Sequence, residues 1–127
     1  MDTGKHLYGF EKLEIWKEAR KFVCMIYEIS QDFPSHELYG LSNQIRRSAV
    51  SVMANIAEGS SRISKKDFAH FLQISYSSLM EVLSHSYLAH DLLYINEENM
   101  IDIRENIYMI SNKINALYRS QIHNSHN

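Results

Sequence analysis

Two pairs of possible metal-ligand or acid–base side chains are spaced so that each pair falls on one face of a helix. Asp67 and His70 are three residues apart, and Glu81 and His85 are four apart. A carboxylate-bridged dimetal site in a helical bundle needs paired Glu-x-x-His elements that face inward. The chain has no such pair of elements, and Asp67 also fits a capping role in the first turn of a helix. We interpret the pairs as a cap and an exposed ion pair, with metal binding as the alternative.

Other kinds of catalytic chemistry have little support in the sequence. The seven histidines form no His-Glu-x-x-His motif, and there is neither a Gly-rich phosphate loop nor a Gly-x-Ser-x-Gly motif. Cys24 is the single cysteine, and it lies on the outward face of its expected helix. A nucleophilic role needs a partner base and an electropositive setting, so we interpret Cys24 as a partly exposed thiol. We predict no enzymatic activity, cofactor or metal.

Arginine and lysine side chains give two possible sites of phosphate contact. Arg46 and Arg47 are adjacent, and either pair with acids on a neighbouring helix or subunit or contact the phosphates of RNA or DNA. Arg62, Lys65 and Lys66 form a second basic group. We take these five residues as the nucleic-acid-binding candidates.

Five tyrosines at helical spacing offer two interpretations. They could stack on bases, or they could form the edges of a hydrophobic core, which is the commoner role at this spacing. The tyrosines are Tyr76, Tyr87, Tyr94, Tyr108 and Tyr118.

The composition favours one small helical domain. The chain has 127 residues, of which 45% are hydrophobic, and only four glycines and one proline. No apolar run is long enough to span a bilayer, the amino terminus lacks the layout of a secretory signal, and one cysteine cannot form an internal disulfide. We therefore expect a soluble cytoplasmic protein. A formal charge of -2 does not suit a dedicated nucleic-acid binder.

Apolar periodicity predicts four helices joined by short connections. They cover about 13–31, about 36–58, a stretch that begins after Ser64 and a stretch that begins after Asn96. Pro34 separates the first two helices, Ser35 is expected to cap the second, and Gly59 is expected to end it in a left-handed conformation. The predicted fold is all-α: an antiparallel up-down-up-down four-helix bundle with left-handed packing over 12–120. Residues 1–11 form a loose arm, from which Leu7, Tyr8 and Phe10 could dock, and 121–127 a flexible tail.

The second helix is expected to be covered on more than one side. Ten residues between Arg47 and Glu58 carry no charge. Three stripes run along this helix: Ile45, Ala49, Val52 and Ile56; Val50, Ala54 and Ala57; and the small polar stripe Gln44, Ser48, Ser51, Asn55 and Glu58. We expect the first stripe to face the core. The other two, eight residues in all, are our candidates for self-association.

The third and fourth helices carry apolar seams that step alternately by three and four residues. In the third helix the seam is Phe68, Leu72, Ser75, Leu79, Val82, Ser86, Ala89 and Leu93; in the fourth it is Met100, Ile103, Ile107, Ile110, Ile114 and Leu117. Up-down topology would also separate the charges. One end gathers seven basic and four acidic side chains, whereas the other gathers one basic and eight acidic.

Several segments resemble the bacterial four-helix-bundle proteins of the 23S rRNA intervening-sequence family. They are Phe10–Trp16, Phe33–Leu41, Gln44–Ser51, Asn55–Gly59 and Ser78–Glu81, so the similarity covers about 10–118. The resemblance implies a ring-like homopentamer without established enzymatic activity. The chain is also similar to the accessory variability proteins of diversity-generating retroelements, which are basic pentamers that bind nucleic acid and a reverse transcriptase.

Two features depart from those families. Ser77-Ser78 stands where the family commonly has Gly-Ser, which could widen a close helix contact, and the net negative charge speaks against nucleic-acid binding. Our first hypothesis is a non-enzymatic, self-associating scaffold, the second an RNA- or DNA-binding protein, and the third a metal-dependent enzyme.

Overall fold

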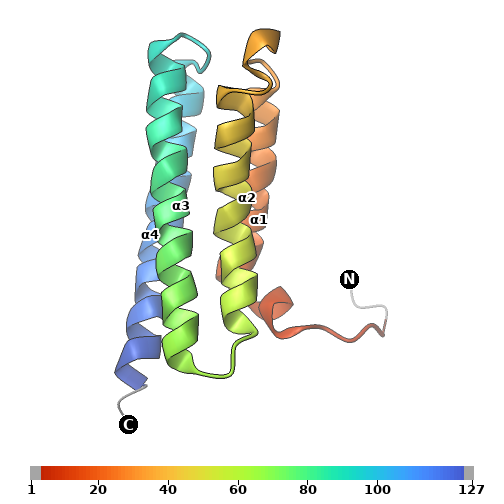
Figure 1. The fold of residues 1–127 in the computed structure, drawn as a ribbon, viewed down its shortest axis with the longest axis vertical. Coiled ribbons are helices and arrows are strands. Elements are labelled where there is room, and N and C mark those ends of the chain that lie inside the picture. Colours follow the sequence, from red (N-terminus) through yellow and green to blue (C-terminus); the bar gives the residue numbers. More distant parts are fainter. Residues whose placement is uncertain (1–3, 125–127) are drawn as a thin grey trace.

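The protein is a bundle of four long antiparallel helices. A computed structural model describes residues 4–124, with side chains described through His123. The helices are α1 (Glu14–Ser30), α2 (Leu41–Ser60), α3 (Lys65–Asp91) and α4 (Glu97–Asn124), and two short 3-10 helices, η1 (Gly9–Lys12) and η2 (Ser35–Glu37), precede α1 and α2. Successive helices run in opposite directions (Figure 1), which confirms the predicted all-α up-down-up-down bundle.

The core lies along the centre of the bundle and is made by the predicted apolar stripes. In α2, the stripe from Ile45 to Ile56 is almost completely buried. The two seams are confirmed over most of their length, because the seam residues of α3 from Leu72 to Ala89 and those of α4 from Met100 to Ile114 are buried. The seam prediction is wrong at Leu93, which lies beyond the end of α3 with a side chain that is 89% exposed.

The second helix begins five residues later than predicted. Ser35 belongs to η2 and makes no side-chain cap, and the chain then turns at Gly40 before α2 starts at Leu41. The N-terminus of α2 is held instead by Glu37, whose Oε1 accepts a hydrogen bond from the Leu41 amide at 3.2 Å. This carboxylate lies over Gly40, where a Cβ would come within 2.8 Å of Oε1. An acidic side chain therefore caps the start of the second helix, a role that we had expected of Ser35.

The prediction for Gly59 is also wrong. Gly59 is buried inside α2, which continues to Ser60, and its φ is not positive. A Cβ at this position would lie 2.7 Å from the Cβ of Phe71 and 2.9 Å from Cδ1 of Phe68. Glycine is required because α2 and α3 approach closely near their shared turn, rather than because the backbone must be left-handed.

The third and fourth helices begin after Ser64 and Asn96, as predicted, and these two residues cap them. Ser64 Oγ accepts a hydrogen bond from the Asp67 amide at 3.0 Å, and Asn96 Oδ1 accepts one from the Asn99 amide at 2.7 Å. The fourth helix continues to Asn124, so 121–124 extend it where we expected the tail to begin. Our predictions for 1–3 and 125–127 lie outside the described residues.

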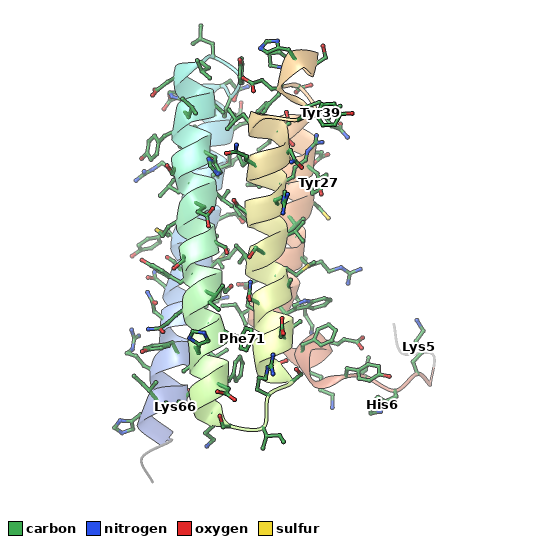
Figure 2. All side chains as sticks on the ribbon, viewed as in Figure 1. Lys5, His6, Tyr27, Tyr39, Lys66 and Phe71 are labelled. Atoms are coloured by element: carbon green, nitrogen blue, oxygen red, sulfur yellow. The ribbon has the colours of Figure 1, made fainter. Side chains whose placement is uncertain are left out.

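The N-terminal arm packs against the bundle through η1. Phe10 packs against Trp16 with ring centroids 4.9 Å apart, whereas Leu7 and Tyr8 are exposed. The described part of the arm leads away from the base of the bundle, and Figure 2 shows Lys5 and His6 far from the helices. Of the three residues expected to dock, only Phe10 has a defined contact with α1.

The topology brings opposite charges to opposite ends of the bundle. The beginning of α1, the α2–α3 turn and the end of α4 share one end in Figure 1, while the α1–α2 and α3–α4 connections share the other. We call the first the basic end and the second the acidic end. No helix within residues 4–124 is long and apolar enough to cross a lipid bilayer.

Candidate functional site

The small polar stripe of α2 faces α3 and is used inside the chain. Ser51 Oγ and Ser78 Oγ lie 2.8 Å apart, and the buried Ser75 donates a hydrogen bond to the carbonyl of Val52 at 2.7 Å. Ser48 is buried and donates to Glu81 Oε2 at 3.5 Å. Small hydroxyls allow the two helices to approach while satisfying each other's hydrogen bonds.

The remaining polar members of this stripe also have partners within the chain. Asn55 Nδ2 donates to the carbonyl of Ser51 at 2.8 Å, and Glu58 accepts from Arg62 at 2.9 Å. Gln44 is exposed beside them. Ser48 and Ser51 thus bind α3, which leaves the outward-facing positions of α2 as the stronger candidates for a contact with another molecule.

Between Arg47 and Glu58, the outward face of α2 is small and apolar. Ala54 is exposed, while Val50 and Ala57 are half-buried, and Val50 packs partly against the core. Exposed charges lie on either side of this stretch, at Arg47 and Glu58. A protein surface that covers this face would remove no charged group from water. The desolvation free energy of covering it is therefore small.

The two adjacent arginines of α2 have different environments. Arg46 Nε donates a hydrogen bond to Ser30 Oγ at 2.7 Å, and its guanidinium lies 5.0 Å from the ring centroid of Tyr27. It therefore joins α2 to α1 through a hydroxyl and an aromatic ring, whereas the sequence had suggested either an ion pair or a phosphate contact. Arg47 is exposed, and among the described residues it makes no ion pair.

A polar groove between α2 and α3 contains Arg47. The groove has a volume of about 450 Å³ and is lined by Tyr39, Asn43, Gln44, Arg47, Ser48, Glu81 and His85. Glu81 and His85 line it together but form no ion pair, so the exposed pair predicted for them is absent. This groove could not be predicted from the sequence, because its lining residues lie about forty positions apart and meet only across two packed helices.

The second basic group lies at the α2–α3 turn. Arg62 pairs with Glu58 at 2.9 Å and lies 4.7 Å from the ring centroid of Phe71, so its charge is engaged within the chain. Lys65 and Lys66 are exposed in the first turn of α3, and neither forms an ion pair in the described structure. Figure 2 shows Lys66 at the foot of the bundle. This turn is the only nucleic-acid candidate group with two lysines directed to solvent.

Residues that could support catalysis are dispersed. Within residues 4–124 there is no group of three His, Cys, Asp or Glu side chains that could hold a metal ion. Cys24 is exposed, as predicted, and His70 packs against Phe71 with ring centroids 5.9 Å apart.

The tyrosines mostly form core edges, as we had preferred. Tyr76, Tyr94 and Tyr118 are half-buried against the core, whereas Tyr87 and Tyr108 are exposed. Burial raises the pKa of Tyr94 above its usual value, helped by the hydrogen bond that its hydroxyl donates to Glu37 and by the negative charge of Glu37. Tyr87 is hydrogen bonded to Arg104. No row of exposed rings suited to base stacking is formed by these five residues.

Comparisons with known proteins agree on a family and a fold. A solved structure of a protein with unknown function from the S23 ribosomal protein family of Bacteroides thetaiotaomicron matches with a TM-score of 0.76 and 23% identity, covering 82% of this chain and 97% of that one. No curated protein matches. The family model for the 23S rRNA-intervening sequence protein matches residues 11–116. The chain therefore belongs to the 23S rRNA-intervening sequence protein family.

Proposed function

We propose that the protein is a non-enzymatic scaffold that assembles with copies of itself through the outward face of α2. The observation that carries this proposal is the small apolar outward face of α2 within the uncharged stretch from Ser48 to Ala57, where Ala54 is exposed and Val50 and Ala57 are half-buried. Exposed helix faces in soluble proteins are normally charged, so an uncharged one on the outside of a bundle fits a covered surface. The pentamer implied by the family resemblance is the assembly that we propose.

Ala54→Glu tests the proposed interface directly. The substitution places a carboxylate in the middle of the uncharged face, where the fold has room for it because Ala54 is exposed. Burying this charge against a partner would be strongly unfavourable. Ala116→Glu is the matched control, since it makes the same change at an exposed alanine of α4.

Light scattering and sedimentation velocity should find one discrete oligomer for the unmodified protein and for Ala116→Glu. Ala54→Glu should shift the protein to a monomer while its circular dichroism spectrum stays helical. An unmodified protein that is monomeric at micromolar concentration contradicts self-association, and an unaffected oligomer in Ala54→Glu contradicts the choice of face.

Nucleic-acid binding through the basic end is a second candidate function. It is supported by Lys65 and Lys66, which are exposed at the positive end of the α3 dipole and close to Arg62. Arg46 contributes little to this proposal because its guanidinium is engaged with Ser30. A repeated basic end in an oligomer would multiply weak phosphate contacts.

Binding of a labelled RNA and a labelled DNA duplex at several salt concentrations tests this second candidate. Phosphate contacts predict an affinity that falls steeply with salt and drops further in Lys65→Glu/Lys66→Glu. Asp102→Lys, at the opposite end, is a control that raises net charge without changing the candidate site. Absent or salt-independent binding contradicts the assignment. A rise in affinity in Asp102→Lys that matches, per unit charge, the fall in Lys65→Glu/Lys66→Glu also contradicts it, because net charge alone would then set the affinity.

A further inference from the structure

The turn after α3 holds a leucine where the backbone favours glycine. The Tyr94 amide donates to the carbonyl of Ala89 at 2.8 Å, and the Leu93 amide donates to that of His90 at 3.0 Å. These two bonds form the Schellman motif that ends many helices, and its left-handed residue is usually glycine. Here the position is occupied by Leu93, whose φ is 66°. Among the described residues, it is the single non-glycine with a positive φ.

No packing of the Leu93 side chain offsets the unfavourable backbone conformation. Its side chain is 89% exposed, whereas the neighbouring Tyr94 and Ile95 pack onto the body of the bundle. A glycine would make the same backbone bonds without the steric conflict of a Cβ. An unfavourable backbone conformation that presents an apolar side chain to water points to a contact outside the monomer.

The surroundings of Leu93 define what such a contact would recognise. Leu92 is also exposed, and the adjoining acids Asp91, Glu97 and Glu98 are exposed as well. Within the described structure, Glu97 pairs only with His90, and the other two make no ion pair. The α3–α4 turn is therefore an apolar tip with an acidic rim, which suits an apolar side chain flanked by lysine or arginine.

A surface of this kind exists at the opposite end of the same chain. Ile63, in the α2–α3 turn, is the most exposed large hydrophobic residue of the described structure, with a relative exposure of 104%. Arg62, Lys65 and Lys66 flank it. The two turns lie at opposite ends of the bundle (Figure 1), so one molecule cannot bring them together, although two molecules placed end to end can.

We propose that copies of this protein associate end to end, with the Arg62–Lys66 turn of one copy docked on the Asp91–Glu98 turn of the next. Ile63 would pack against Leu92 and Leu93, and Lys65 and Lys66 would face the acidic rim. The contact is head to tail, so it leaves a free turn of each kind at the two ends of the assembly. It is separate from the α2 face and does not depend on lateral assembly.

Complementary single variants test this contact. Leu93→Gly removes the more exposed leucine of the apolar tip but keeps the basic turn, and Ile63→Ser removes the basic turn's apolar side chain but keeps the tip. Both are made in the Ala54→Glu background, so that lateral assembly through α2 does not contribute to the measured mass. Sedimentation equilibrium at low salt is measured for each variant alone and for an equimolar mixture.

The parent should show concentration-dependent association that weakens as salt rises, because charged rims take part. Each variant alone should associate about tenfold more weakly, as expected for the loss of one buried aliphatic side chain. The mixture should form pairs, since each variant supplies the turn that the other lacks. Leu93→Gly should also unfold at a higher temperature than its parent, because glycine relieves the backbone conflict.

Several outcomes would overturn the proposal. The first is a parent that does not associate at about 100 μM, a concentration at which a contact of ordinary weak affinity is half-occupied or more. The second is association that is unchanged in both single variants. The third is a mixture of the two variants whose mass distribution equals the sum of the two measured separately. Binding of the acidic turn to another basic protein while the chain fails to self-associate would likewise reject a second copy as the occupant.

Discussion

Gly59→Ala provides the sharpest test of how α2 and α3 pack. The added methyl would meet Phe71 Cβ at 2.7 Å and Phe68 Cδ1 at 2.9 Å, with the carbonyl oxygen of Phe68 at 3.4 Å. The Phe68 ring can rotate slightly, but Phe71 Cβ is fixed to the α3 backbone. Relief of the contact therefore requires the two helices to move apart near their shared turn.

Two opposing effects set the size of the change. Alanine is favoured over glycine inside a helix by up to about 1 kcal/mol. Forcing an extra methyl group into a packed site usually costs about 1–3 kcal/mol, and the fixed position of Phe71 Cβ places Gly59 at the upper part of this range. We expect the free energy of unfolding to fall by about 2 kcal/mol, which corresponds to a Tm about 6–10 °C lower for a chain of this size.

Urea denaturation at fixed protein concentration, with thermal melts alongside, measures the change. Gly9→Ala is the matched control, because a Cβ at Gly9 would meet no atom within 4 Å and its φ is not positive. The control should be neutral or slightly stabilising. A Gly59→Ala protein at least as stable as the unmodified one would refute the inferred close approach of α2 and α3.

Three further predictions concern individual side chains. Ser75→Ala removes the buried hydrogen bond to Val52 and should lower the free energy of unfolding by about 1 kcal/mol; an unchanged urea midpoint contradicts this. Arg46→Gln removes the hydrogen bond to Ser30 and the stacking on Tyr27, so it should lower the free energy of unfolding by about 1–2 kcal/mol. It should leave any RNA affinity unchanged, and a loss of affinity would identify Arg46 as a phosphate contact. The folded state raises the pKa of Tyr94, so the unfolded chain loses this proton first, and stability should fall as pH rises above about 10. Tyr94→Phe should reduce this slope, whereas equal slopes would contradict the raised pKa.

The sequence predicted the helices better than their ends. The apolar seams of α3 and α4 identify the buried faces because helix geometry places residues three and four apart on one side. The end signals were less certain, since one residue type can serve different purposes. Gly59 resembled a left-handed helix stop, but its missing side chain leaves space for Phe71 in the packing of α3 against α2. Leu93 continued a seam by spacing, yet it lies in a turn beyond the helix.

The candidate sites depended still more on packing between helices. Sequence identified Arg46 and Arg47 as an adjacent pair, but it could not assign one to Ser30 and the other to a groove beside Glu81. Likewise, the small polar stripe of α2 suggested a close helix approach without indicating which helix. Such assignments require the rotation of each helix about its axis, which is set by contacts among all four.

The sequence by itself determined the four-helix architecture, the buried stripes and the separation of charge between the two ends. These follow from local periodicity and from the fact that short connections force neighbouring helices to run in opposite directions. Only the tertiary structure decided that Ser51 faces α3, that Gly59 is needed for space and that Leu93 stands exposed in a left-handed turn. The physical reason is that a periodic pattern fixes which residues share a helix face, whereas the partner of that face depends on distances across the bundle.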